Sequence, residues 1–136
     1  MKKYRVAIRL APIAFIAVAL TVSAAEAARV QMLTKAAQAT LEELKRNDFD
    51  RVEARFDTRM SEALPTEKLT TTWQTIIEQV GVIGACKDAT TSERDGYLIV
   101  VLPCDAANMP IDAQFVYDTD NKIAGMFIRP RATPAG

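Results

Sequence analysis

The first half of the chain repeats its apolar residues at helical spacing. Between about residues 30 and 46, apolar positions recur every three or four residues with polar side chains between them, which predicts one amphipathic helix. Its apolar positions are Val30, Leu33, Ala37, Leu41 and Leu44, and its polar positions include Lys35, Gln38, Glu42, Glu43 and Lys45. We therefore expect one face of this helix to lie in the core.

Two more helices are predicted after the first. Asn47 ends the first helix, and Asp48 is placed to cap a short second one, because its side-chain oxygen can accept hydrogen bonds from first-turn amides. The second helix has its apolar face at Phe49, Val52 and Phe56. A third helix is predicted to start at Leu64-Pro65, since the fixed φ of proline suits a first turn, and to end at Gly81. Its apolar stripe is Leu69, Trp73, Ile76, Ile77 and Val80.

From Val82 onward the apolar spacing shortens towards two, which is typical of β-strands. Arg94-Asp95-Gly96-Tyr97 predicts a tight hairpin, because Asp-Gly readily takes the positive φ values of a type I′ turn. In the register of this hairpin, Cys86 lies one residue out of line with Cys104, so a single bulge would bring the two cysteines together.

Three further segments complete the predicted sheet. Residues 97–103 are apolar on both faces and are expected to be central, whereas residues 111–117 alternate and should have one wet face. A turn at 118–121 leads to the fourth strand, residues 122–128. Helices first and an antiparallel meander afterwards predict an α+β fold. We expect the N-terminal helices to pack on a four-stranded antiparallel sheet, with the third helix laid across it.

The first 27 residues have the pattern of a cleaved secretory signal peptide. A basic head precedes an uncharged stretch from Leu10 to Val22, and Ala25-Glu26-Ala27 supplies small residues at the positions that a signal peptidase reads. We predict cleavage between Ala27 and Ala28. The uncharged stretch is shorter than the about 20 residues that a membrane-spanning helix needs, which disfavours a retained anchor. That anchor and a buried N-terminal helix are the alternatives to a cleaved leader.

Removal of this leader (residues 1–27) leaves a single α+β domain, which we place at residues 28–129, and a flexible tail at 130–136. The whole chain has 17 basic and 17 acidic residues, of which the leader contains four and one. The mature chain is therefore mildly acidic, which disfavours nucleic acid or an anionic membrane as a partner. The predicted location is the periplasm or the extracellular space.

Cys86 and Cys104 are the only cysteines, and export would place them where thiols are oxidised. We predict a disulfide between them, for which the chain-entropy model gives about 3 kcal/mol. Two buried free thiols are the alternative, because cysteine packs well as a small apolar residue. The chain has no histidine, and two thiolates alone fall short of a zinc site, so neither a metal nor a cofactor is expected.

Both halves of the chain contain short motifs of turn residues and apolar residues. The helical half contains Asp48-Phe49-Asp50, Arg55-Phe56-Asp57, Met60, Ala63-Leu64-Pro65-Thr66-Glu67-Lys68-Leu69, Trp73 and Gly81. The sheet half contains Gly96-Tyr97, Val100, Cys104, Asp112, Asp118, Ile123, Gly125 and Phe127. Over about residues 30–130, these motifs resemble the bacterial and archaeal domain-of-unknown-function family 3887 (DUF3887). The resemblance implies a cone-like layer similar to nuclear-transport-factor-like and cystatin-like domains, in which a curved sheet wraps around helices.

Folds of this shape can hold a small ligand inside the cone. The candidate ligand-binding residues are Trp73, Tyr97, Phe115, Tyr117 and Asp57, with Asp112 and Arg55 as further polar groups. A carboxylate in an apolar cavity would have a raised pKa and could transfer a proton. The alternative is structural, because Trp73 belongs to a helix stripe, tyrosines commonly end strands and Asp57 can cap a helix.

Three functional hypotheses are consistent with these features. The first is a non-catalytic module that binds a periplasmic protein or a small apolar ligand. It is motivated by export and by the lack of histidine, which removes the commonest general base, so no catalytic residue is assigned. The second is a small cone-type enzyme, such as an isomerase or cyclase, that uses Asp and Tyr for acid–base chemistry. The third is a homodimeric structural or accessory protein that pairs through its exposed sheet face.

Overall fold

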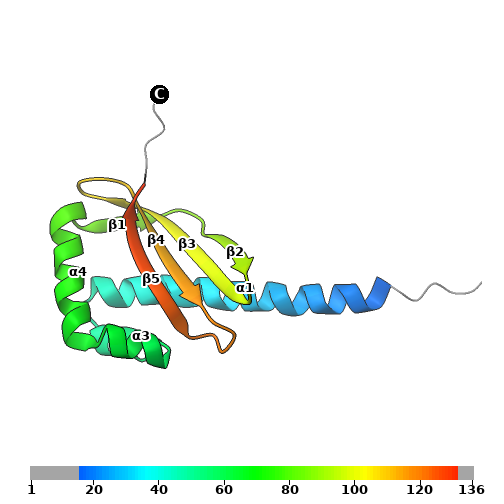
Figure 1. Cartoon of the computed structure of the whole chain (residues 1–136). Coiled ribbons are helices and arrows are strands. Elements are labelled where there is room, and N and C mark those ends of the chain that lie inside the picture. Colours follow the sequence, from blue (N-terminus) through cyan, green and yellow to red (C-terminus); the bar gives the residue numbers. More distant parts are fainter. Residues whose placement is uncertain (1–15, 132–136) are drawn as a thin grey trace, which may run out of the picture.

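The computed structural model describes residues 16–131, with side chains from residue 24 onward. Helices are followed by a curved, open antiparallel sheet, so the predicted α+β class is confirmed (Figure 1). The helices are α1 (Ile16–Lys45), α2 (Phe49–Glu53), α3 (Thr58–Ala63) and α4 (Thr66–Val80). The strands are β1 (Ile83–Cys86), β2 (Thr90–Arg94), β3 (Tyr97–Ala106), β4 (Ile111–Tyr117) and β5 (Ile123–Pro130).

α1 is longer than the helix predicted over residues 30–46. It starts at Ile16 and passes without a break through the predicted cleavage point. Residues 24–28 are exposed, and burial begins at Arg29 and Val30. The buried face further along is the predicted one and includes Leu33, Ala37, Leu41 and Leu44. In Figure 1 the blue N-terminal part of α1 extends past the sheet, and within residues 24–131 the side chains of α1 become partly buried only from Arg29 onward.

The leader prediction lies partly outside this structure. Residues 1–15, which include the basic head, are outside the described range, and cleavage between Ala27 and Ala28 stays a prediction. Across residues 16–131, no helix is both long enough and apolar enough to span a membrane.

The segment after α1 forms two short helices, not the single one predicted. Phe56 leaves the helical path and forms a parallel β-bridge with Ile123. Asp48 makes no capping hydrogen bond, because its backbone (φ −90°, ψ 64°) is not in the extended form that a capping residue usually adopts. Asp57 does cap α3, where its Oδ1 accepts a hydrogen bond from the Met60 amide at 2.7 Å.

α4 begins at Thr66 and is capped by a residue of another helix. Pro65 stands at the N-cap position and makes no side-chain cap. The Glu53 carboxylate takes this role, since it accepts hydrogen bonds from the Thr66 hydroxyl, the Thr66 amide at 3.1 Å and the Ser61 hydroxyl at 3.1 Å. The Thr66 hydroxyl, followed by that of Ser61, lowers the pKa of Glu53. Gly81 ends α4 with φ 82°, as predicted.

The sheet contains five strands instead of the four predicted. Their order is β1-β3-β4-β5, and β2 pairs with β3 beyond the end of β1. The hairpin between β2 and β3 has the predicted register, with Arg94 opposite Tyr97 and positive φ values at the Asp-Gly turn. The chain leaves the ladder between β1 and β2, so the first arm of the predicted hairpin is divided into two short strands.

This division brings the cysteines together. The register slips by one residue between Cys86 and Thr90, in the way predicted for a bulge, and again within β1. Cys86 therefore lies opposite Cys104, and the two form a disulfide with their Cα atoms 3.9 Å apart.

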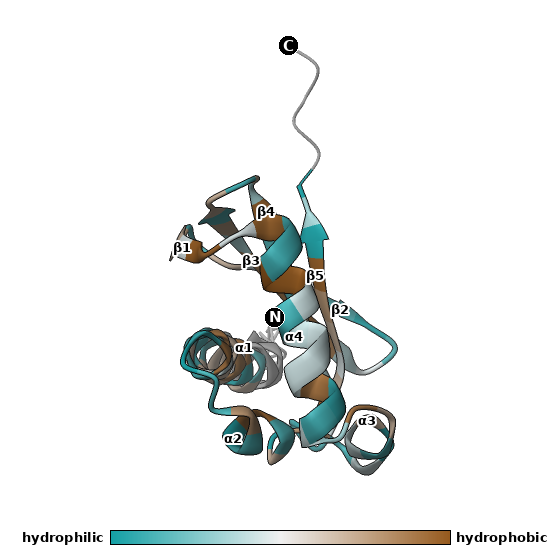
Figure 2. Cartoon of the chain, turned by 90° about the vertical axis from the view of Figure 1, so that its left-hand side faces the viewer, coloured by the Kyte–Doolittle hydropathy of each residue, from teal (hydrophilic) through white to brown (hydrophobic). Residues whose placement is uncertain are grey.

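α1, and not α4, lies along the sheet. The inward-facing residues are Leu98, Val100, Leu102 and Cys104 of β3 and Ile111, Ala113, Phe115 and Tyr117 of β4. They form one core cluster with the buried face of α1. α4 crosses beside the end of this layer, as Figure 2 shows in a view along α1. The longer apolar face of α1 explains why it takes the position that the sequence suggests for α4.

The last strand extends beyond its predicted end at Ile128. β5 runs to Pro130, which pairs with Ile111. Arg131 is also fixed, because its guanidinium donates hydrogen bonds to Asp112 and to the Ile111 carbonyl, both at 2.9 Å. The rest of the predicted tail, residues 132–136, lies outside the described residues.

We expect Glu53→Ala to lower the thermal unfolding midpoint at pH 7, because the first turn of α4 loses its acceptor. The pKa of Glu53 is lowered in the folded state, so its stabilisation is fully present above the ordinary value of 4.5 and is lost as the pH falls through the folded value. The midpoints of wild type and variant should therefore approach each other as the pH falls, which thermal unfolding of both proteins from pH 7 to about pH 3 measures. Glu62→Ala, exposed on α3, is the matched control. Equal midpoints for Glu53→Ala and wild type at pH 7 would contradict the capping role.

Candidate functional site

An apolar groove lies between α4, the turn after α1 and the start of β1. Its volume is about 460 Å³, within the range of small-molecule sites. Trp73, Ile77 and Ile83 form its floor, and Val82 forms an exposed edge. The polar residues around it are Lys45, Asn47, Gln74 and Glu78. We call this site the α4–β1 groove.

A tight corner after α4 fixes both walls of the groove. Gly81 has φ 82°, and a Cβ there would lie 2.7 Å from the Cβ of Ala107, so glycine is required. The Asn108 side-chain amide donates a hydrogen bond to the Gln79 carbonyl at 3.1 Å, and the Ala107 amide donates one to the Val82 carbonyl at 3.0 Å. The end of α4 and the start of β1 are thus both fastened to the loop between β3 and β4.

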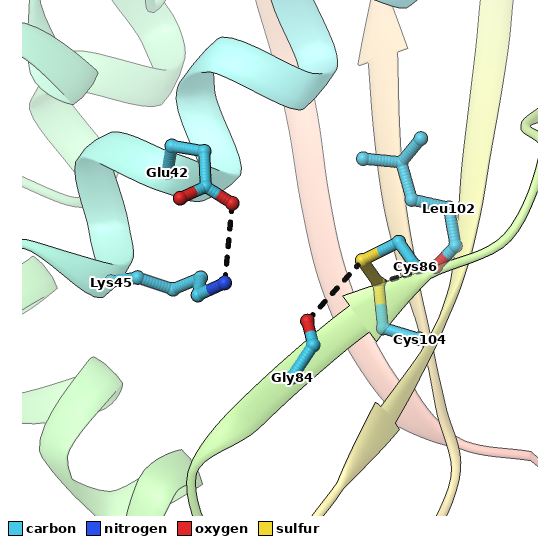
Figure 3. Close-up of polar contacts among 6 residues, drawn as sticks. All are labelled: Glu42, Lys45, Gly84, Cys86, Leu102 and Cys104. Atoms are coloured by element: carbon cyan, nitrogen blue, oxygen red, sulfur yellow. Dashed lines mark hydrogen bonds and ion pairs between the residues drawn. A yellow bond between two sulfur atoms is a disulfide. The ribbon is translucent and has the colours of Figure 1, made fainter.

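The disulfide fixes the other end of β1, as Figure 3 shows. Cys104 is buried on the central strand and Cys86 is exposed on the edge strand, so the bond holds the edge to the centre of the sheet. A smaller hollow of about 270 Å³ beside it is lined by residues of α1, β1 and β3. Lys45 lines both this hollow and the α4–β1 groove, and it forms an ion pair with Glu42 at 3.2 Å.

The five candidate ligand residues do not converge on one cavity. Trp73 lines the α4–β1 groove. Phe115 and Tyr117 are 0% and 2% exposed and pack in the core between the sheet and α1. Tyr97 and Asp57 line a separate hollow on the other face of the sheet. The five residues therefore lie in three separate places, because successive residues of a strand face opposite sides of the sheet. A ligand-binding role for any of them stays a prediction.

Arg55, whose side chain is 34% exposed, belongs to a partly buried polar cluster that also contains Glu43 of α1. Its guanidinium donates hydrogen bonds to both carboxylate oxygens of Glu43, at 2.8 and 3.0 Å. The helical pattern places Glu43 on the polar side of α1, yet it is only 5% exposed, and the ion pair compensates its burial. Thr40, one turn earlier, is also buried and donates a hydrogen bond to the Ala36 carbonyl at 2.7 Å.

The Tyr117 hydroxyl reaches this cluster. Burial raises the pKa of Tyr117 from 10.0 to about 12, although Arg55 and Thr40 oppose the rise. No described residue lies in hydrogen-bonding geometry with the hydroxyl, so the influence of Thr40 falls short of a full hydrogen bond. A tyrosine and a carboxylate thus come together, but Glu43 is already bound by Arg55. Acid–base chemistry would need a free carboxylate in an open cavity.

The sequence pattern alone does not reveal most of the groove. It assigns Lys45 to a helix surface, Asn47 to a helix end and Val82 to a strand, without bringing them together. The signal that was available is the apolar pair Val82-Ile83 directly after the helix-ending Gly81, where the chain turns back on itself.

Residues 37–126 match a family described as protein of unknown function, DUF3887. This chain belongs to the DUF3887 family. The matched region contains both cysteines and every residue that lines the α4–β1 groove. A similar fold occurs in the NMR structure of a protein from Ruminococcus gnavus ATCC 29149, with a TM-score of 0.57 and 18% identity over 71% of this chain and 88% of that one. A search of curated proteins gave no match. The match over residues 37–126 shows the family, whereas the likeness to the Ruminococcus gnavus protein shows the fold alone.

We expect Tyr117→Phe to leave the free energy of unfolding at pH 7 unchanged or to raise it by about 1 kcal/mol, because a buried hydroxyl without a partner is removed. Tyr117 of the wild type holds its proton more tightly in the folded state than in the unfolded state. The protonated side chain therefore contributes its full share to the free energy of unfolding below pH 10, and this share is lost between pH 10 and about 12. The variant should therefore be the more stable of the two by a growing margin in that range.

Urea unfolding at pH 8 and at about pH 11 measures this margin. Tyr97→Phe is the matched control, since that side chain is 44% exposed, and it should follow the wild type. A destabilisation of Tyr117→Phe at pH 8 by more than about 1 kcal/mol would show that the hydroxyl has a partner after all.

Proposed function

We propose that this DUF3887 protein is an exported, non-catalytic module that binds a small apolar ligand in the α4–β1 groove. The observation that carries the proposal is the side chain of Val82, which is 74% exposed at the edge of a hollow whose floor includes Trp73 and Ile83. A ligand that covers this surface removes it from water and gains about 25 cal/mol for each Å² of apolar area.

The residues around the groove favour an amphiphile. Ile77 and Trp73 offer an apolar floor, whereas Lys45, Asn47 and Glu78 place donors and acceptors where the groove meets solvent. A ligand with an apolar body and one polar head fits this arrangement. The rim has one cation and one carboxylate, so the apolar body would contribute more to affinity than the charge of the head.

The walls of the groove are held before any ligand arrives. The Gly81 corner fastens α4 and β1 to the same loop, and the disulfide fastens the far end of β1 to β3. A preformed site loses little conformational freedom on binding, which favours affinity for a small molecule.

The proposed export rests on the boundary of the packed domain and on the disulfide. A disulfide is consistent with an extracytoplasmic location. Residues 24–28 are exposed, and the first partly buried side chain described is that of Arg29. Among the leader residues whose side chains the structure describes, 24–27, cleavage between Ala27 and Ala28 would therefore remove no buried side chain.

Arg29 would be the second residue of the processed chain and ties its start to the sheet. The guanidinium donates hydrogen bonds to the Asn121 side chain at 3.0 Å, to the Glu93 carboxylate at 3.1 Å and to the Asp118 carbonyl at 2.9 Å. These contacts join the helix to β2 and to the turn between β4 and β5.

The finer fold assignment also belongs to this proposal. A curved, open sheet with α1 along one face supports a cone of the nuclear-transport-factor-like or cystatin-like kind. A cone of this kind is compatible with a binding role, but the α4–β1 groove lies at its end and not in its filled interior.

Trp73 is the only tryptophan of the chain, so its fluorescence reports directly on the groove. We expect saturable changes in its emission on titration with decanol and with decanoate. Val82→Asp should weaken binding by at least about tenfold, because it places a charge where the apolar body lies. Met32→Asp, at an exposed apolar residue of α1 outside the groove, is the matched control and should bind as the wild type does. No saturable response to either probe, or equal affinity in Val82→Asp, would sink the proposed ligand class.

Expression of the full chain with its leader should yield a secreted product whose intact mass corresponds to a start at Ala28 and an oxidised cysteine pair. Arg29→Ala in this product should lower the free energy of unfolding by about 1 kcal/mol, because three partly exposed hydrogen bonds are lost. Arg46→Ala, exposed at the other end of α1, should change it by less than about 0.5 kcal/mol. A product that keeps residues 1–27 would contradict the processing step.

A further inference from the structure

The outer face of the sheet has a second hollow that the groove hypothesis does not use. Figure 1 looks onto this face, and among residues 16–131 no helix lies across β3, β4 and β5 there. Tyr97 of β3 and Phe127 of β5 both point to this side and are 44% and 43% exposed. Together with Val116 of β4 and other residues they line a hollow of about 450 Å³. We call it the open-face hollow.

Small residues make room between the two aromatic rings. Val116, Ala124 and Gly125 line the hollow together with Tyr97 and Phe127. Gly125 pairs with Val116 on the neighbouring strand, so these two residues lie side by side. Their short side chains leave the two aromatic rings as the largest apolar groups of the lining, which suits a flat or disc-shaped ligand.

The Phe127 ring is held in position from two sides. The Arg129 guanidinium lies 5.0 Å from its centroid, in a cation–π contact. A Cβ added at Gly125 would come within 3.2 Å of the Phe127 Cε2 atom, so the ring edge packs closely over the glycine. The ring is thus placed before binding, despite its exposure.

The remaining lining residues carry opposite charges. Asp57 uses one carboxylate oxygen to accept the Met60 amide, and within residues 24–131 its second oxygen makes no hydrogen bond. Arg59 is exposed, and its guanidinium likewise makes no hydrogen bond or ion pair to the described residues. An anion entering the hollow would be repelled by the Asp57 carboxylate, and a cation would be repelled by the Arg59 guanidinium. A neutral ligand that both donates and accepts hydrogen bonds would be matched by both groups.

We propose that the open-face hollow binds a neutral carbohydrate. A pyranose ring has apolar C–H faces that cover aromatic rings and a periphery of hydroxyl groups that donate and accept hydrogen bonds. Tyr97 and Phe127 supply the apolar contact, Asp57 accepts from hydroxyl groups, and Arg59 donates to them. The proposal is independent of the α4–β1 groove, because the two sites share no residue.

Saturation-transfer NMR and calorimetry on the processed wild-type protein test this with maltose, cellobiose and N,N′-diacetylchitobiose as probes. We expect at least one disaccharide to bind at millimolar concentration or below, with transfer to the ring C–H protons. Tyr97→Ala and Phe127→Ala should each weaken that binding at least about tenfold. Phe127→Leu should weaken it nearly as much, since apolar bulk remains but the ring is lost.

Gly125→Ala provides a subtler test. Its backbone is outside the positive-φ region, so alanine is tolerated there, but the Phe127 ring must shift by a few tenths of an ångström. We expect a loss of affinity of about threefold with little change in melting temperature. Val82→Asp is the control at the other site and should leave sugar binding unchanged, whatever its effect on decanol.

Three outcomes would overturn the inference. The first is the absence of binding by all three disaccharides up to about 20 mM, which is beyond the weak end of ordinary ligand affinity. The second is equal binding by wild type, Tyr97→Ala and Phe127→Ala, provided that the melting temperatures show folded variants. The third is saturable binding of phenol at this hollow without binding of any sugar, which would assign the site to flat aromatic ligands.

Discussion

The packing of α1 against the inner faces of β3 and β4 holds the rest of the structure in place. The buried face of the helix and the inward-facing side chains of both strands form a single core cluster. Large-to-small substitution of a buried leucine in such a core costs about 2–5 kcal/mol, so few of these contacts can be lost. Several other parts of the molecule meet this helix at points along its length. Arg29 joins it to the sheet turns, Glu43 to the segment after α2, and Lys45 to the α4–β1 groove.

Features set by neighbouring residues follow from the sequence. The Asp95-Gly96 turn determines the register of the hairpin, and that register places the cysteines within one residue of each other. The stripe of α4 and its end at Gly81 follow in the same way, because spacing and positive φ are local properties. The family also follows, since its motifs are mostly turn residues and apolar spacings.

Features that depend on residues far away in the chain could not be predicted from the sequence. Glu43 is buried because Arg55, twelve positions away, binds both of its oxygens, and nothing in the helical pattern announces that contact. Glu53 caps α4 from another helix, which no local rule for capping residues would find. The candidate site differs from expectation for a similar reason. Tyr97 and Tyr117 both belong to strands, but only the packing of α1 decides which of the two faces is closed.

The break between β1 and β2 has a consequence for how the molecule meets copies of itself. A long, straight strand at the border of a sheet presents a row of unused amides and carbonyls, which invites pairing with another chain. Here that border is cut into one strand of four residues and one of five, the second entirely exposed and carrying Glu93 and Arg94. On the opposite border, β5 ends in Arg129 and Pro130, and proline has no amide to offer. The slip that aligns the two sulfur atoms therefore also shortens the strands at this border, which is one of the ways in which native sheets limit strand addition.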